Sequence, residues 1–307
     1  MAWNESANPT PDRRLVEACR FALKSVFILS LSWAFAMGSA LSPAGGTLVL
    51  AIPTNQGLVI AADRRTTPRG IYCDGVRKIL LPNIPGVAVF ITGIATMSDM
   101  STIPDDRLCE ELSKTRAPID FGRATVAFIE KQTAPLTQVD GQQLTEALFT
   151  EVRSYIDGGQ LRSVFGQQRL TTILIASFDH GSNLSRIWQF WVNYTGPVYF
   201  QLQPLPVRTF SLDDKPDIVP FGENEYYFQN VLAGVGRQFV SEDVHALYRK
   251  SSVARVSEKE ACDACVSLID AATKAAELIK PPSGIGGGVD CALIGQETKF
   301  LEPRQAR

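Results

Sequence analysis

Apolar residues along the chain fall into short continuous runs and longer helical periods, separated by turn signals. From Thr47 the runs TLVLAI and LVIAAD flank the turn segment PTNQG, a pattern that predicts a β-hairpin. The runs KILLP and GVAVFITG predict a second pair of strands, joined through residues 83–85. Because these runs are apolar at nearly every position, we expect both faces of their sheet to be covered.

The rest of the chain continues this alternation. Residues 102–158 are helical in character and end with QQLTEALFTEVRSYI, whose apolar positions recur at helical spacing. LTTILIASFD and SRIWQFWVNY predict another strand pair with a turn at Gly181, and PVYFQLQPLPVRTF is extended. Ser257 and Glu260 have the spacing of a capping box before a long helix, and VDCALIG predicts a last strand. This order predicts an α+β fold in which sheets lie between helices.

The first 46 residues differ from the rest of the chain. Residues 13–24 are rich in arginine and lysine, and the apolar run Val26–Met37 is followed by small residues up to Gly46. A basic region, a short apolar core and a small-residue exit form a secretory signal peptide. The apolar run is shorter than the roughly 20 residues of a membrane span, although an uncleaved anchor stays open.

We therefore predict a leader at residues 1–46 that is removed and a single domain at residues 47–307. Cleavage after Ala40 or after Gly46 fits the small residues there, and the second cut would make Thr47 the new N-terminus. The leader predicts export to the periplasm or the medium. Without a leader, the protein would stay in the cytoplasm.

Composition excludes several function classes. The net charge is −2 with mixed signs, which indicates no nucleic-acid-binding face. Only His180 and His245 are available for a histidine triad or a zinc site, so no metal or organic cofactor is expected. Five cysteines remain once the leader is removed, an odd number that gives no clean disulfide framework. We interpret Cys262 and Cys265, a CxxC, as small residues on one helix.

Counting along the first hairpin brings Thr47 next to a carboxylate. If the turn centres on Asn55, Ile52 faces Leu58 and Thr47 faces Asp63. Side chains that face each other across two strands have Cβ atoms about 4.5–5.5 Å apart.

A threonine at the chain start can act as a nucleophile without histidine. Its α-amine serves as the base, because the pKa of such an amine is about 7.7–8.0. A neighbouring lysine lowers that pKa further, and a carboxylate holds the lysine in place. The sequence offers Thr47, Asp63 and Lys78, the last at the head of the next strand. Gly45 and Gly46 suit self-cleavage, because they let the backbone bend toward the Thr47 hydroxyl.

The segments Gly-Thr, Val-Ile-Ala-Ala-Asp-x-Arg, Arg-Lys-Ile and Thr-Gly resemble proteasome β-subunits and their bacterial relatives among the N-terminal-nucleophile (Ntn) hydrolases. The resemblance is strongest over residues 46–95. Asp63 follows Thr47 by the sixteen positions usual in the family, and Lys78 follows Asp63 by fifteen, one fewer than usual. The resemblance implies that Arg65 is the arginine of Asp-x-Arg. It also implies that the Gly93 N–H helps to form the oxyanion hole.

One further position departs from the family pattern, and another is a candidate match. The Gly-Ser-Gly of the family corresponds here to Gly234-Val235-Gly236, which has no hydroxyl. Ser283 is a candidate for a later serine of the family. For Arg65 we expect a structural ion pair rather than a catalytic role.

The resemblance implies a four-layer αββα sandwich, the Ntn-hydrolase fold, and a homo-oligomeric ring. The predicted function is a threonine-type hydrolase that cleaves peptides or unfolded proteins after self-cleavage or signal peptidase exposes Thr47. Two alternatives stay open: an amidase for small amides, and a non-catalytic structural or binding subunit, which Val235 favours. Since ATP is scarce outside the cytoplasm, an exported form would work without an ATP-driven unfoldase.

Overall fold

The computed structural model describes residues 47–67, 70–93, 96–97, 104–110, 119–133, 136–157, 168–196, 199–222, 234–279 and 284–302. They belong to one unit of the chain, Ala44–Arg307. The predicted leader, with its apolar run Val26–Met37, lies outside the described residues. Among the helices of the described ranges, none is both long and apolar enough to cross a membrane.

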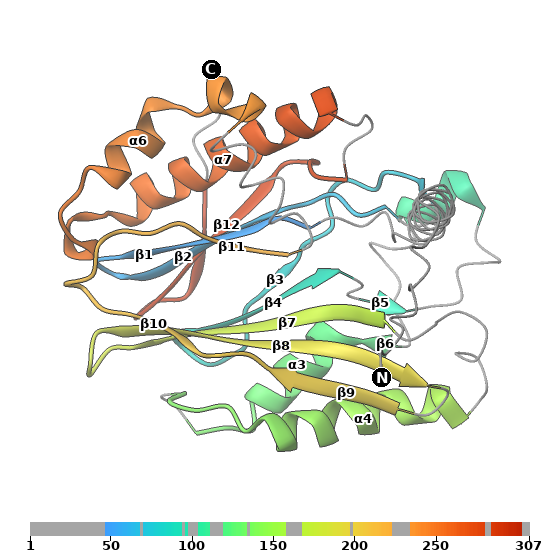
Figure 1. The fold of residues 1–307 in the computed structure, drawn as a ribbon. Coiled ribbons are helices and arrows are strands. Elements are labelled where there is room, and N and C mark those ends of the chain that lie inside the picture. The colour runs from blue at the N-terminus through green and yellow to red at the C-terminus, as the bar shows by residue number, and fades with distance from the viewer. Residues whose placement is uncertain are drawn as a thin grey trace, which may run out of the picture. The chain divides into compact units, whose positions relative to one another are not determined.

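Two antiparallel sheets form the centre of this unit (Figure 1). The first sheet combines the predicted N-terminal hairpin with strands from the end of the chain. Its five strands, in spatial order, are β11 (Val219–Phe221), β1 (Val49–Thr54), β2 (Gly57–Asp63), β12 (Val289–Gly295) and β13 (Lys299–Leu301).

The second sheet contains the other two predicted strand pairs. Its strands in spatial order are β10 (Arg208–Phe210), β8 (Leu184–Gly196), β7 (Gln168–Asp179), β4 (Val87–Gly93) and β3 (Ile79–Leu80), with β9 (Tyr199–Pro204) also paired to β8. A separate short pair consists of β5 (Thr96–Met97) and β6 (Ile119–Asp120).

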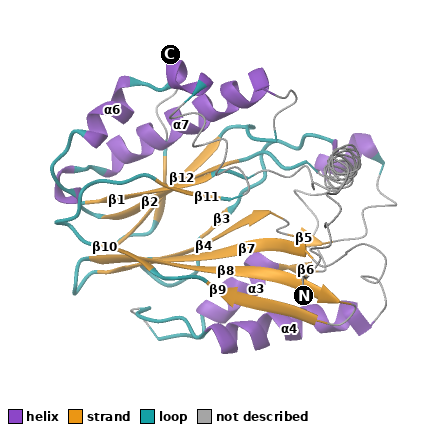
Figure 2. Ribbon diagram, viewed as in Figure 1, coloured by secondary structure: helices purple, strands orange, loops and turns teal. Residues whose placement is uncertain are grey.

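Helices lie on the outer faces of the two sheets (Figure 2). Within the described ranges they include α3 (Phe121–Ile129), α4 (Gly141–Asp157), α6 (Glu242–Tyr248) and α7 (Glu258–Ile279), with short 3-10 helices η2 (Asp105–Arg107), η3 (Val235–Phe239) and η4 (Val253–Arg255). Helix α7 packs against the first sheet and against α6, whereas α3 and α4 cover the second sheet.

Strand β1 shows why the N-terminal runs are apolar at every position. Leu50 and Ile52 point into the apolar cluster beneath α7, and Val49 and Ala51 point into the cluster between the two sheets. Successive side chains of a strand alternate between faces, so a strand that is covered on both sides needs no polar position. The expectation that both faces are covered is confirmed.

The predicted hairpin is present, but its pairing differs by one residue. A two-residue turn, Asn55 and Gln56, joins the strands, and the Asp63 N–H donates to the Leu48 carbonyl oxygen (3.2 Å). Asp63 therefore faces Leu48, and the prediction that it faces Thr47 is wrong. Two-residue turns match the twist of a hairpin, whereas a turn centred on Asn55 would need three residues.

The α+β class, with antiparallel sheets, is confirmed. The capping box before α7 is also confirmed. The Ser257 N–H donates to the Glu260 carboxylate (3.0 Å), and the Glu260 N–H donates to the Ser257 hydroxyl (3.3 Å). The sequence pattern did not predict strands β11 and β13, which flank the first sheet.

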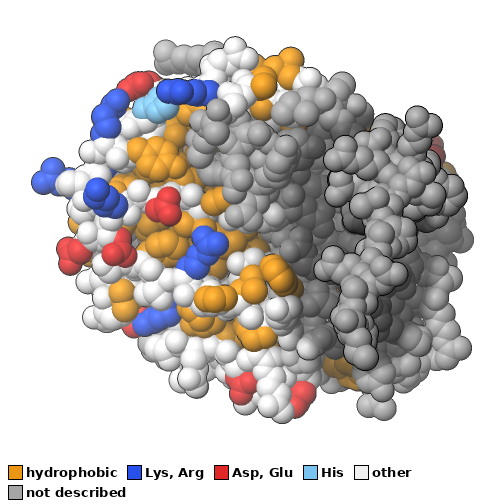
Figure 3. All heavy atoms as spheres, viewed as in Figure 1, with side chains coloured by type: hydrophobic (Ala, Val, Ile, Leu, Met, Phe, Trp, Pro, Cys, Tyr) orange, Lys and Arg blue, Asp and Glu red, His pale blue; other side chains and the backbone are white. Residues whose placement is uncertain are grey.

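Charged side chains of both signs are interspersed on the described part of the face in Figure 3. Some of the surface charges form ion pairs, such as Lys250 with Glu260 at 2.7 Å. This mixture agrees with the balanced charge of the sequence.

Candidate active site

The four predicted catalytic residues lie at the ends of four strands. Thr47 lies two residues before β1, Asp63 ends β2, Lys78 directly precedes β3 and Gly93 ends β4. The first two residues thus belong to the first sheet and the other two to the second sheet.

Asp63 and Lys78 form a buried ion pair that links the two sheets. The Lys78 ammonium lies 3.0 Å from Asp63 Oδ1, and the two side chains are 6% and 0% exposed. Oδ1 also accepts the Leu48 N–H (2.9 Å), and Oδ2 accepts the Gly286 N–H (3.3 Å). A charge without solvent needs such partners, because an unpaired buried charge is costly.

Burial acts on both members of this pair. It raises the pKa of the Asp63 carboxyl, while the Lys78 charge and the N–H groups of Leu48 and Gly286 oppose that shift. Burial also lowers the pKa of the Lys78 ammonium, which the Asp63 carboxylate opposes. The lysine therefore holds its proton less firmly than an exposed lysine, and its charge depends on Asp63.

Thr47 directly precedes Leu48, a partner of Asp63 in this pair. The N–H that Asp63 accepts is that of the peptide bond between Thr47 and Leu48. Thr47 itself is 4% exposed. An α-amine would exist at this position only after cleavage at Gly46, which lies outside the described residues.

Gly222 brings the ends of three strands together around Thr47. It follows β11 with φ of +114°, and a Cβ placed on it would overlap the Thr47 carbonyl oxygen and lie 3.5 Å from Thr92 Cγ2. Thr92 precedes Gly93, whose φ of +88° is also in the region that favours glycine. The backbone that ends β4 therefore lies close to the start of β1.

Arg65 contributes to this region through its backbone. Its carbonyl oxygen accepts a hydrogen bond from the Lys78 ammonium (2.5 Å). Its guanidinium donates twice to Asp74, at 2.8 and 3.1 Å, and lies 5.0 Å from the centre of the Tyr72 ring. The hydrogen bonds with Asp74 raise the pKa of Arg65, and those with Arg65 lower the pKa of Asp74.

The sequence reasoning missed Gly286 as a partner of Asp63. This residue has φ of +144°, and a Cβ on it would lie 2.9 Å from Arg65 Cζ. The available signal was the glycine-rich segment GIGGG before the last strand, because such a run permits close approach of another segment. The Arg64 N–H donates to the carbonyl oxygens of Gly286 and Gly288, at 3.0 Å each.

The remaining predicted positions lie elsewhere. Ser283 is outside the described residues. Gly234 precedes η3, a helix that packs against α7, and Val235 is 53% exposed.

The structure pairs four of the cysteines, a pairing that the sequence left open. Cys73 is joined to Cys109 and Cys262 to Cys291, while Cys265 is a buried free thiol. The odd count that gave no clean framework from the sequence corresponds to two pairs and one unpaired thiol among the described residues. The CxxC lies on one helix, as interpreted, but its first cysteine pairs with β12.

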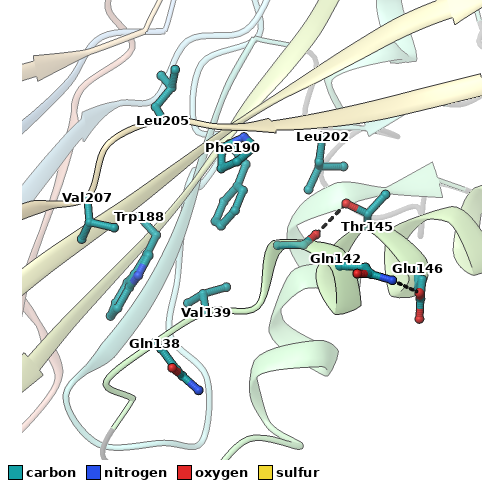
Figure 4. Close-up of a pocket in the computed structure, with 12 residues that line it drawn as sticks. Gln138, Val139, Gln142, Thr145, Glu146, Trp188, Phe190, Leu202, Leu205 and Val207 are labelled. Atoms are coloured by element: carbon teal, nitrogen blue, oxygen red, sulfur yellow. Dashed lines mark hydrogen bonds between the residues drawn. The ribbon is translucent and has the colours of Figure 1, made fainter.

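An apolar groove lies away from the predicted residues, between the first turns of α4 and strands β8 and β9 (Figure 4). Its volume is about 750 Å³, and Trp188 and Phe190 form part of its lining. Both rings are almost fully buried in the core of the second sheet. The ionisable side chain in the lining is Glu146, which accepts a hydrogen bond from Gln142 (3.2 Å). Within the described ranges, no cluster of three or more His, Cys, Asp or Glu residues could hold a metal ion.

Comparisons with known proteins add little to this geometry. No protein-family model matches the chain. No curated protein matches it. Among solved structures, the chain is similar to a mutant of Anbu from Hyphomicrobium sp. strain MC1, at 17% identity and a TM-score of 0.42, over 84% of this chain and 85% of that chain. Because both values are low, the likeness carries no argument about activity.

Proposed function

We propose that this protein is a threonine-type Ntn hydrolase with the four-layer αββα fold, and that it cleaves peptide bonds with Thr47 as the nucleophile. The observation that carries the proposal is the buried Asp63–Lys78 pair at the peptide that follows Thr47. A fully buried ion pair is rarely the most stable solution for a protein core, so its position beside a candidate nucleophile favours a functional role.

In the proposed reaction, the Thr47 hydroxyl attacks the substrate carbonyl and its own α-amine accepts the hydroxyl proton. The Lys78 cation keeps the pKa of that amine low through like-charge repulsion, and Asp63 holds the lysine. The Gly93 N–H donates to the oxyanion that forms on the carbonyl oxygen. The amine then gives its proton to the leaving amine, and water releases the acyl group from Thr47.

The first test is intact mass and N-terminal sequencing of the purified native protein. A chain that begins at Thr47 is the expected result, because only a free α-amine can serve as the base. A hydrolytically active preparation that retains Gly46 would refute the mechanism.

The second test uses Thr47→Ala and Thr47→Ser, produced as chains that begin at residue 47. We expect Thr47→Ala to lose hydrolysis of fluorogenic peptides by about 10⁴-fold or more, since it lacks the nucleophile. Thr47→Ser keeps a hydroxyl and should retain measurable activity. Equal rates for wild type and Thr47→Ala would exclude Thr47 as the nucleophile.

The same experiments separate the alternatives. A non-catalytic subunit, favoured by the exposed Val235 in place of a serine, would begin at Thr47 or earlier and hydrolyse nothing. An amidase for small amides would lose its activity in Thr47→Ala but would show no preference for longer peptides.

We also propose that the protein is exported. The disulfide between Cys73 and Cys109 supports this, because disulfides persist in oxidising compartments and are rare in the cytosol. Outside the cytoplasm the substrates would be peptides or unfolded proteins, cleaved without an ATP-driven unfoldase. Cell fractionation that finds only full-length cytosolic protein would contradict export.

A further inference from the structure

The segment between Asp63 and Lys78 folds back on itself. We call the described residues 64–67 and 70–78 of this segment the site arm. Thr66 and Cys73 form an antiparallel bridge in which each N–H donates to the other residue's carbonyl oxygen, at 2.9 and 2.8 Å. Nearer the base of the arm, the Val76 N–H donates to the Arg64 carbonyl oxygen (3.0 Å).

The shape of the arm determines where the Lys78 ammonium lies. Besides Asp63, this ammonium has the Arg65 carbonyl oxygen as a partner, at 2.5 Å. Arg65 is fixed in turn by its two hydrogen bonds to Asp74, on the returning half of the arm, and by the Tyr72 ring. If the two halves separated, the lysine would lose one of its two oxygen partners.

A disulfide fixes the returning half of the arm. Cys73 is 1% exposed and is bonded to Cys109, which lies 36 positions further along the chain and two residues after η2. Cys109 Sγ also lies 3.5 Å from the Tyr72 carbonyl oxygen. The crosslink therefore ties the part of the arm that contacts Arg65 to a segment outside the arm.

We propose that the Cys73–Cys109 disulfide is a positioning element for the hydrolase, because it holds the site arm closed and thereby keeps the Lys78 ammonium on Asp63, at the peptide that follows Thr47. This inference rests on the proposed function. Reduction by a dithiol transfers two electrons and two protons: the S–S bond breaks, two thiols form, and the dithiol becomes a cyclic disulfide. The opened arm then lets Lys78 move, so the pKa of the Thr47 amine rises and less of the base is available near pH 7.

The test compares mature wild type with Cys109→Ser, whose altered side chain is only partly buried. We expect kcat/KM for a fluorogenic peptide to fall roughly 10- to 100-fold at pH 7, mainly through kcat, because a small displacement of a catalytic group is costly. The acidic limb of the pH profile should move up by about one unit. Wild type treated with dithiothreitol should behave like Cys109→Ser, and the variant should not respond to the reductant.

Cys262→Ala is the matched control, because it removes the other cysteine pair, which joins α7 to β12. It should keep the wild-type pH profile and stay sensitive to dithiothreitol. The proposal is overturned if reduced wild type keeps its rate. It is equally overturned if reduced wild type loses thermal stability and activity together, with no change in the pH profile, because the crosslink would then only stabilise the fold.

A last measurement keeps this inference separate from the proposed function. In Thr47→Ala, hydrogen exchange at the amides of Thr66, Cys73 and Val76 should accelerate on reduction, whether or not the protein is an enzyme. If wild type proves inactive, the hydrolase proposal fails and these amides alone decide whether the disulfide closes the arm. Unchanged exchange would overturn the inference.

Discussion

The charges of Asp63 and Lys78 depend on each other, since both side chains are buried. Asp63→Asn keeps the size of the side chain but leaves the Lys78 ammonium without its counter-charge. Such a change costs about 3–5 kcal/mol, and urea denaturation at pH 7 should show a loss in this range. Burial already lowers the pKa of Lys78, so the lysine in the variant can release its proton as the pH rises. The difference in unfolding free energy between Asp63→Asn and wild type should therefore become smaller toward alkaline pH.

A double-variant cycle provides the control for this pair. Asp63→Asn combined with Lys78→Met removes both charges, so the combined loss of unfolding free energy should be smaller than the sum of the two single losses. Strict additivity would mean that the two charges do not stabilise each other.

Gly222 is a second residue with a specific role. Gly222→Ala should displace the end of β11 from Thr47, because its φ of +114° is strained for alanine and the new methyl group would overlap the Thr47 carbonyl oxygen. We expect a loss of about 2–4 kcal/mol in unfolding free energy and a loss of hydrolysis. Gly70→Ala is the control, since φ is +79° there and nothing lies within 4 Å of the new Cβ. Its loss should be about 1 kcal/mol; equal losses in the two variants would contradict the overlap argument.

At the residue scale, the sequence predicts charged site residues better than it predicts close contacts between backbone segments. Asp63 and Lys78 could be found because each is a charged residue at the end of an apolar run. The roles of Gly222 and Gly286 could not be found in this way. Each depends on a segment more than 150 positions away, Thr47 for one and Asp63 for the other.

At the scale of elements, length and periodicity decide what the sequence predicts. Strands β7 and β8 are long enough for their apolar runs to predict them, and the capping box predicts the start of α7. Strand β11 has three residues, one of them proline, so it carries no alternation, although it borders β1. Cysteine connectivity also escapes sequence reasoning, because four paired cysteines allow three arrangements.

The capping box of α7 gives an element-scale prediction about pH. Hydrogen bonds with Lys250 and with Ser257 lower the pKa of Glu260 to about 2. The contribution of a group with a lowered pKa is present above its unfolded pKa, near 4.5, and is lost as the pH falls toward about 2. Glu260→Gln should therefore cost about 0.5–1 kcal/mol of unfolding free energy at pH 7, a small value because the carboxylate is half exposed.

Denaturation series at pH 7, 5 and 3 would check this, and the loss should shrink at pH 3. The exposed Glu302→Gln serves as the control and should have little effect at any of these values. A loss that stays constant over the series would show that the ionised carboxylate contributes nothing to the cap.

At the scale of the whole molecule, the order of the elements predicted the α+β class, because sheets that are apolar on both faces must lie between other layers. What it could not predict is which strands share a sheet. The first sheet joins residues 49–63 to residues 289–301, and such long-range pairing leaves no local pattern.

The oligomeric state is a property of the whole molecule that can be tested. We expect the mature protein to form a closed homo-oligomeric ring, visible in light scattering and native mass spectrometry as a single mass that is a multiple of the subunit mass. Thr47→Ala should form a ring with the same number of subunits, because the side chain that it shortens is buried within the subunit. A monomer at micromolar concentration would contradict the ring.

In the first hairpin, the number of residues in the turn matters more for the pairing of β1 with β2 than the identity of those residues. Asn55 and Gln56 are exposed, so replacements at these positions should leave the strands unchanged. An insertion that shifts the pairing by one residue would instead turn Asp63 to the opposite face of the sheet, away from Lys78. Related chains and engineered variants should therefore tolerate other residues at these two turn positions, while insertions and deletions there should eliminate the proposed hydrolysis.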